Sequence, residues 1–249
     1  MNKHQSEMNR RRFVGAAALT TAVGVAGGAG RALAAEDKKV QTGKHQMPSP
    51  HKGRKPEVGM LLHPGVTLLD LLGPHTVLAP SCNVHLAWKN TDLLETDSGI
   101  VMKASCTFDD CPKDLDVLFV PGGSFEVMED AEVLRFLADR GARAKWVTSV
   151  CGGSIVLGAA GLLQGYKATS HWAARELLTN FGATPVEGRV VTDRNRVSGG
   201  GVTAGLDFGL VLLAKMLGED VAKMTQLALE YDPPRRSTPA HRRRPARWS

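Results

Sequence analysis

Short apolar runs alternate with longer segments of helical spacing between residues 57 and 232. The apolar runs predict strands over residues 57–62, 82–88, 115–120 and 145–150. Apolar residues that recur every three or four positions predict helices over residues 71–79, 124–140, 154–163, 171–178, 202–217 and 220–229. Residues 184–197 have the pattern of a hairpin around Asp193-Arg194-Asn195.

This order of elements predicts the class of fold. Strands that alternate with helices, and that are short and apolar throughout, are typical of a largely parallel sheet covered by helices on both faces. In such sheets the working groups lie where strands end and loops begin. The chain has 249 residues, of which 43% are apolar, and it shows no internal repeat, so we expect one α/β domain over residues 57–232.

The charged residues distinguish this domain from the two ends of the chain. The formal net charge is +6, but Lys and Arg are concentrated near both ends, and residues 57–232 carry a net charge of −8. Basic ends on an acidic body are typical of solvated tails, and no spacing of a helix-turn-helix or zinc-finger module is present in the sequence. A nucleic-acid partner is therefore not expected.

The first 34 residues have the pattern of a twin-arginine export signal. Arg10-Arg11 is followed by a spacer and an apolar pair, then by an uncharged segment up to Gly30 and a small-residue cleavage pattern at Ala32-Leu33-Ala34. The uncharged segment is rich in Ala and Gly and less apolar than a membrane span. We expect a signal that is removed after Ala34, with an uncleaved anchor as the alternative. The mature protein would then be periplasmic or secreted, exported in folded form and free of the membrane. The predicted parts are a signal over 1–34, a linker over 35–56, the domain over 57–232 and a basic tail over 233–249.

Two loops at predicted strand ends carry candidate chemistry. Asp70 is the only charged residue in HPGVTLLDLLGP. An unbonded polar group in apolar surroundings costs roughly 2–7 kcal/mol, so Asp70 either belongs to a functional site or caps the following helix. In the second loop, Gly122 and Gly123 allow backbone N–H groups to approach a ligand as an oxyanion hole, or they form an ordinary tight turn.

A third loop places Cys151 between an apolar strand and two glycines that begin a helix. A thiolate at a helix N-terminus has a lowered pKa and is nucleophilic, and the glycines permit a sharp turn that displays it. The alternative is a small side chain buried at a turn, which is common for free cysteines. Spacing alone leaves both readings open.

Four motifs together resemble the ThiJ/PfpI superfamily, and within it most of all the isonitrile hydratases. They occur between residues 58 and 234 in the order HPGVTLLDLLGP, LFVPGGS, SVCGGSIVLGAAGLLQGYKATSHW and SGGGVTAGLDFGL. The resemblance implies a three-layer α/β fold of the flavodoxin-like or class I glutamine amidotransferase-like type, mostly parallel, with helices on both faces. It also implies a homodimer.

The resemblance implies that Cys151 is the nucleophile and Asp70 the acid beside it. In the expected reaction the Cys151 thiolate adds to the carbon of an isonitrile, while Asp70, held protonated by its apolar setting, donates to the nitrogen. Asp70 then activates a water molecule, which releases the thiol and an N-substituted formamide. The expected partner is a small-molecule substrate. No cofactor and no metal are expected, in agreement with the lack of clustered metal-ligand spacing in the sequence.

The resemblance extends to the residues around this pair. It implies that the N–H groups of Gly123 and Gly152 face developing negative charge and that His171 lies near the cysteine. Gly152 and Leu72 depart from the isonitrile hydratase pattern, which has threonine at both places, and the loop after Gly123 is shorter. A water molecule and Ser154 are both candidates to supply the hydroxyl that Gly152 lacks.

Two other functions remain open at this point. One is an α-oxoaldehyde hydratase or deglycase, although the branches with that activity normally place Glu where Asp70 stands. The other is a non-catalytic ligand or redox sensor whose thiol is oxidised to sulfenic acid.

The remaining cysteines and histidines carry no assigned role. If Cys151 stays free, the other three cysteines allow at most one disulfide, and Cys106 and Cys111 are near enough in sequence to pair. The resemblance favours buried thiols there. His63 is interpreted as a structural histidine close to the expected pocket.

Overall fold

The computed structural model describes residues 52–233, which belong to one compact unit of the chain. Its centre is a seven-stranded sheet in the order β10-β11-β7-β6-β1-β2-β5. Neighbouring strands are parallel except β10 and β11, which are antiparallel. The strands are β1 (Glu57–Leu61), β2 (Asn83–Trp88), β5 (Cys106–Thr107), β6 (Val117–Val120), β7 (Trp146–Val150), β10 (Val190–Asp193) and β11 (Arg196–Gly199).

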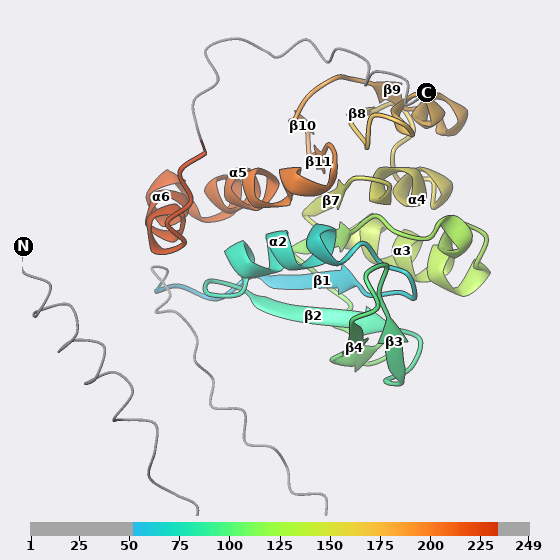
Figure 1. Ribbon diagram of the computed structural model, residues 1–249, viewed down its shortest axis with the longest axis horizontal. Coiled ribbons are helices and arrows are strands. Elements are labelled where there is room, and N and C mark those ends of the chain that lie inside the picture. The colour runs from blue at the N-terminus through green and yellow to red at the C-terminus, as the bar shows by residue number, and fades with distance from the viewer. Residues whose placement is uncertain (1–51, 234–249) are drawn as a thin grey trace, which may run out of the picture. The chain divides into compact units, whose positions relative to one another are not determined.

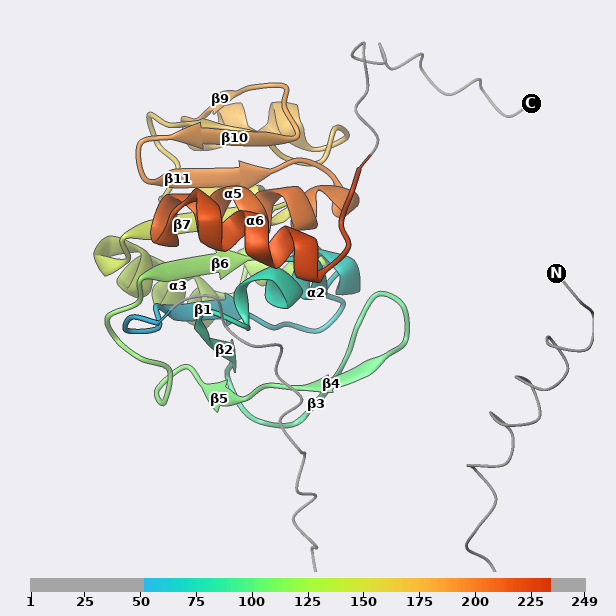
Figure 2. The same cartoon turned by 90° about the vertical axis from the view of Figure 1, so that its left-hand side faces the viewer.

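Helices cover both faces of this sheet (Figure 1). Helix α5 packs against α2 and α6 on one face, which is in front in Figure 2, and α3 lies behind the sheet together with α4. The helices are α2 (Leu68–Leu78), α3 (Ala131–Arg143), α4 (Gly153–Ala159), α5 (Gly205–Leu217) and α6 (Glu219–Ala228), with short 3-10 helices η1 (Phe125–Met128), η2 (Arg175–Phe181) and η3 (Val202–Ala204). The predicted three-layer, mostly parallel α/β fold is confirmed.

The central strands are buried along almost their whole length because both of their faces are covered. Every residue of β6 is buried, and all of β1 and β7 except the first residue of each is buried. Burying one large aliphatic or aromatic side chain contributes roughly 1.5–3 kcal/mol, so such a strand is stable only in the interior of the sheet. The burial of these strands fixes the position of the loops at their carboxyl ends.

Some predicted elements differ from the observed ones. The predicted helix over 124–140 is divided into η1 and α3, because the Asp130 side chain accepts hydrogen bonds from two N–H groups of a new first turn. The predicted helix over 202–217 likewise begins as η3 before α5. The predicted hairpin is confirmed in its β10–β11 part. Short strands without a clear apolar pattern were not predicted: β3 (Leu93–Glu95), β4 (Val101–Lys103), β5, β8 (Lys167–Ala168) and β9 (Thr184–Pro185).

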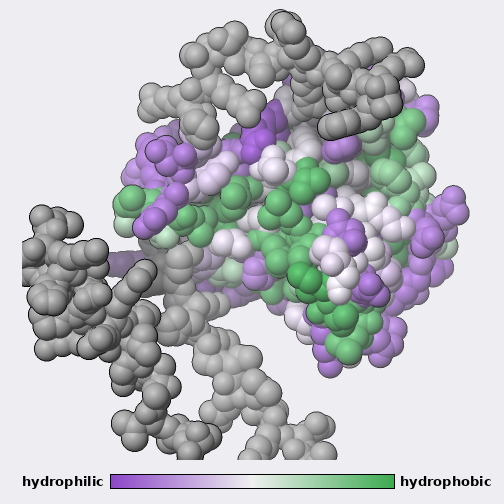
Figure 3. All heavy atoms as spheres, in the orientation of Figure 1, coloured by the Kyte–Doolittle hydropathy of each residue, from purple (hydrophilic) through white to green (hydrophobic). Residues whose placement is uncertain are grey.

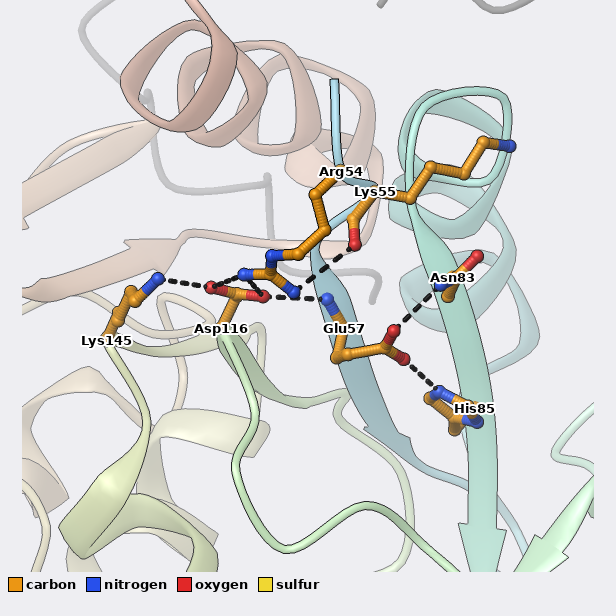
Figure 4. A network of polar contacts seen from close by, with 7 residues as sticks. All are labelled: Arg54, Lys55, Glu57, Asn83, His85, Asp116 and Lys145. Carbon is orange, nitrogen blue, oxygen red and sulfur yellow. Dashed lines mark hydrogen bonds and ion pairs between the residues drawn. The ribbon is translucent and has the colours of Figure 1, made fainter. Parts of the chain in front are cut away.

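A polar network ties the amino ends of the central strands together (Figure 4). The Asp116 carboxylate accepts hydrogen bonds from Arg54 at 2.8 Å, Lys145 at 2.6 Å and the Glu57 N–H at 2.9 Å. The Glu57 side chain in turn binds His85 at 2.7 Å. The last residues of the predicted linker are therefore held on the domain. The predicted signal, most of the linker and all but the first residue of the basic tail lie outside the described residues.

None of the helices within residues 52–233 has the length and apolar character needed to cross a lipid bilayer.

Candidate functional site

Cys151 occupies a strained turn between β7 and α4. Its φ angle is 57°, in the left-handed region that non-glycine residues rarely adopt. The Cys151 N–H donates to the carbonyls of Gly199 and Gly200, at 3.1 and 2.8 Å, and its carbonyl accepts from Ser170 Oγ at 2.7 Å. These three bonds hold the residue in its strained conformation. The sharp strand-to-helix turn predicted from the sequence is present.

Gly153 makes this turn possible by its lack of a side chain. A Cβ atom at this position would lie 2.1 Å from the Val120 carbonyl oxygen and 2.7 Å from that of Pro121. Both oxygens belong to the backbone of the neighbouring strand and loop, so they cannot move aside as a flexible side chain would. The glycine therefore allows α4 to begin directly against β6.

Asp70 lies across from this turn, in the first turn of α2, and is fully buried. Its Oδ2 accepts a hydrogen bond from the Gly122 N–H at 3.0 Å, and its carboxyl group interacts with the Cys151 thiol. Oδ1 is buried and has no hydrogen-bond donor among the described residues. The N-cap of α2 is Thr67, and Asp70 makes no capping bond, so helix capping is not its role.

The absence of a side chain at Gly122 lets the carboxyl and the thiol approach each other. A Cβ atom there would lie 2.6 Å from Asp70 Oδ2, 2.8 Å from the Gly152 nitrogen and 3.0 Å from Cys151 Cβ. The three loops that the sequence marked as candidates therefore meet at one point at the carboxyl ends of β1, β6 and β7. This is the edge of the sheet where α/β proteins place functional groups.

The electrostatics of this pair differ from the sequence-based expectation. Burial raises the pKa of Asp70 to about 6, although the Cys151 thiol and the Gly122 N–H oppose this shift. Burial and the charge of Asp70 raise the pKa of Cys151 to about 12, although the Gly152 N–H opposes it. The predicted thiolate of lowered pKa is wrong, because the adjacent carboxylate and desolvation outweigh the start of the short helix α4. The raised pKa of Cys151 keeps its thiol protonated at neutral pH, and burial raises the pKa of Asp70 in the direction expected from its apolar setting.

Gly123 and His63 form the wall next to this pair. Gly123 has a φ of 144°, and a Cβ there would lie 2.8 Å from His63 Cε1. His63 is fully buried, and its Nδ1 donates to the Pro64 carbonyl at 2.9 Å, which leaves Nε2 without a partner among the described residues. Burial lowers the pKa of His63, so the ring is neutral and Nε2 is an acceptor. The only sign of His63 in the sequence was its position directly after the first predicted strand.

Phe125 occupies the space beside Gly152. Two atoms of its ring lie 3.0 and 3.2 Å from the position of a Cβ on Gly152, so a threonine at that place would crowd the ring. Ser154 does not replace the missing hydroxyl, because its buried Oγ bonds Ser149 Oγ at 2.8 Å and the Thr169 carbonyl at 2.6 Å. Phe125 was not identified from the sequence, since nothing in SFEVMED marks it as a neighbour of Gly152.

His171 lies farther along the rim of the site. Its ring is next to Gly201, 3.3 Å from where a Cβ would be, and lies 5.6 Å from the ring of the exposed Trp172. Its Nδ1 accepts from the Ala173 N–H at 3.4 Å. No hydrogen bond within residues 52–233 joins His171 to Cys151 or Asp70. Among the described residues, no group of three or more metal-ligating side chains is present.

Comparison with known proteins agrees with this fold. Residues 56–215 match the DJ-1/PfpI family. The isonitrile hydratase of Pseudomonas putida is 51% identical over 181 residues, which are 71% of this chain and 79% of that protein. Deglycase PfpI of Pyrococcus furiosus is 28% identical over 134 residues, 52% of this chain and 81% of that protein. A crystal structure of a ThiJ/PfpI family protein from Pseudomonas syringae is 46% identical, with a TM-score of 0.73 over 80% of this chain and 87% of that one. The chain therefore belongs to the DJ-1/PfpI family.

Proposed function

We propose that the protein is a cysteine-dependent hydratase that adds water to isonitriles and releases N-substituted formamides. The observation that carries this proposal is the buried pair of Cys151 and Asp70, in which the carboxyl group interacts with the thiol while Asp70 Oδ1 has no hydrogen-bond donor among the described residues. The 51% identity to the isonitrile hydratase of Pseudomonas putida supports the choice of substrate.

In the first step the pair adds sulfur and hydrogen to the terminal carbon of the isonitrile. Asp70 accepts the thiol proton as the Cys151 sulfur forms its bond to carbon, because a carboxylate with a pKa near 6 is a competent base at neutral pH. Asp70 then returns this proton to the substrate. A neutral thioimidate, R–N=CH–S–Cys, requires the added hydrogen on carbon, so the carbon is the final position of the proton and not the nitrogen.

In the second step water releases the product. Asp70, again a carboxylate, takes a proton from a water molecule as the hydroxide adds to the thioimidate carbon, and passes this proton to the nitrogen, which gives the adduct R–NH–CH(OH)–S–Cys. The carbon–sulfur bond then breaks, the hydroxyl proton of the adduct passes through Asp70 to sulfur, and R–NH–CHO leaves. The net reaction converts the isonitrile and one water molecule into the formamide, and the pair returns to its starting state.

The glycines have separate tasks in this proposal. The Gly122 N–H is already bonded to Asp70 and orients the carboxyl, while the Gly152 N–H faces sulfur and stabilises its negative charge during attack and departure. No hydrogen bond of the Gly123 N–H is found within the described residues, so this donor is free for the substrate. His171, at the rim, contacts the outer part of the bound molecule.

The choice of substrate is tested with two compounds on the mature chain. Cyclohexyl isocyanide should give cyclohexylformamide, and methylglyoxal should give no lactate. The Cys151→Ala variant is the matched control for both. Lactate from methylglyoxal with no formamide from the isonitrile would replace the proposal by the α-oxoaldehyde activity.

The acid limb of the pH profile reports the ionisation of Asp70. The value of kcat/KM should fall about tenfold per pH unit below an apparent pKa of about 6, because protonated Asp70 cannot accept the thiol proton. Above that value it should stay level through neutral and mildly alkaline pH. Steady-state rates of formamide formation across this range check it. A rate that keeps rising into the alkaline range would show that a free thiolate, rather than the pair, is the reactive form.

The same pKa values argue against a redox sensor. Peroxides oxidise the thiolate, and a Cys151 pKa of about 12 keeps the thiol protonated at neutral pH. Slow reaction of Cys151 with hydrogen peroxide is therefore expected in the resting protein.

Assembly and location remain proposals. Apolar side chains are exposed on α2 at Leu69 and Leu72, and on the β3–β4 hairpin at Leu93, Ile100 and Val101. Figure 3 shows hydrophobic residues gathered on one face of the molecule. We propose that a second copy of the chain covers α2 in a homodimer, which gel filtration tests.

We also propose export through the twin-arginine pattern. Replacing both Arg10 and Arg11 by lysine should then retain the protein in the cytoplasmic fraction.

A further inference from the structure

Cys106 and Cys111 form a second thiol site, which lies at the β5 edge of the central sheet and is separated from β7, the strand before Cys151, by three strands. Cys106 is in the edge strand β5, which pairs with β2, whereas Cys151 follows β7. The Cys111 N–H donates to the Thr107 carbonyl at 3.0 Å and closes a turn. This turn brings the Cys111 thiol next to the Cys106 thiol, and the two thiols interact.

The two thiols are exposed to different degrees. Cys106 is half-buried, and its sulfur also contacts the Leu86 carbonyl at 3.8 Å. Cys111 is 1% exposed, and a Cβ on Gly59 would lie 3.6 Å from its sulfur. An external reagent therefore reaches Cys106 first and meets Cys111 only after bonding to Cys106.

The surroundings also make the two thiols chemically unequal. The interaction with the Cys111 thiol lowers the pKa of Cys106 to about 7, with a further contribution from His85 and opposition from burial and from Asp110. The same interaction and burial raise the pKa of Cys111, while Arg140 opposes this shift. One accessible thiol with a depressed pKa next to a buried thiol is the arrangement of an attacking and a resolving cysteine.

We propose that Cys106 and Cys111 are a disulfide-forming site that reacts with small-molecule or protein disulfides, with Cys106 attacking and Cys111 resolving. The Cys106 thiolate attacks one sulfur of the external disulfide, forms a mixed disulfide and releases one thiol. Cys111 then loses its proton and attacks the Cys106 sulfur, which releases the second thiol. The domain loses two hydrogen atoms, and the external disulfide is reduced to two thiols. This reaction is separate from the proposed hydratase activity and does not depend on it.

The test uses the mature chain with Cys151→Ala, so that the thiol of the first site cannot interfere. This parent is incubated in its folded state with oxidised glutathione, quenched with acid, and analysed by peptide mass mapping. We expect an internal Cys106–Cys111 disulfide in the parent and stable glutathione on Cys106 in the Cys111→Ser variant. The Cys106→Ser variant should react at least about tenfold more slowly, because Cys111 is buried and its pKa is raised.

Cys82→Ser is the matched control. Cys82 is buried, and burial raises its pKa to about 12, so its replacement should leave the reaction unchanged. The proposal is overturned if Cys106 stays reduced in the folded parent while the unfolded chain reacts. It is also overturned if glutathione persists on Cys106 with Cys111 present, since that would show that Cys111 does not reach the mixed disulfide.

Discussion

Replacing Cys151 with alanine is expected to lower kcat for formamide formation by at least about 1,000-fold. The sulfur is the atom that would bond to substrate carbon, and no other described thiol is next to Asp70. Both residues are L-amino acids with a Cβ atom, so the strained turn at a φ of 57° carries the same cost in the variant and the parent. Thermal unfolding should therefore be little changed, and the loss of rate can be assigned to the nucleophile.

Two further variants sharpen this result. Cys151→Ser should be as inactive as Cys151→Ala, because a hydroxyl is a far weaker acid than a thiol and Asp70, with a pKa of about 6, cannot deprotonate it. Cys82→Ser should keep the activity of the parent, since Cys82 is a buried core residue away from the pair. Activity within about tenfold of the parent in Cys151→Ala would contradict the proposed nucleophile.

Replacing Asp70 with asparagine is expected to remove activity but to make the folded protein more stable, relative to the parent, as the pH rises. The rate should fall by about 100- to 10,000-fold, because asparagine cannot take the thiol proton. The buried carboxylate is destabilising when charged, since the pKa rises from 3.8 in the unfolded chain to about 6 in the folded one. The parent therefore loses stability as the pH rises from about 4 to about 6 and loses no more from this group above that window.

This loss has a predictable size. A shift of about two pKa units corresponds to roughly 3 kcal/mol, and about 2–3 kcal/mol is expected after water penetration is considered. The free energy of unfolding of Asp70→Asn, measured relative to the parent by urea denaturation, should rise by that amount between about pH 4 and about pH 8. The free-energy cost of burying the asparagine amide does not depend on pH, so it cancels when the stability differences at the two pH values are subtracted. A difference that does not change with pH would show that Asp70 is not buried as a charged group.

The central part of the fold was predictable because it follows from burial. The strands β1, β6 and β7 are covered on both faces, so they appear in the sequence as short, mainly apolar runs. The elements that were missed, such as β5 and β8, have two residues each and show no periodicity. The break between η1 and α3 depends on one side chain, that of Asp130, which a helical pattern does not reveal.

The site was predictable only in its outline. The glycines after Cys151 and the lone charge of Asp70 have local signals, and the parallel sheet brings their loops to one edge. The direction of the Cys151 pKa depends on a carboxyl that the fold places beside it, and this effect outweighs the local effect of the helix. The position of Phe125 against Gly152 likewise follows from tertiary packing alone.

The most direct test of the Cys151–Asp70 mechanism is the mass of the enzyme during turnover of cyclohexyl isocyanide. Samples are quenched with acid at successive times under saturating substrate and digested, and the peptide that contains Cys151 is weighed. The mechanism predicts a transient increase equal to the mass of the isonitrile on that peptide, which decays as formamide appears and is absent in Cys151→Ala. Formamide production with Cys151 unmodified at every time, or with the adduct on another residue, would contradict it.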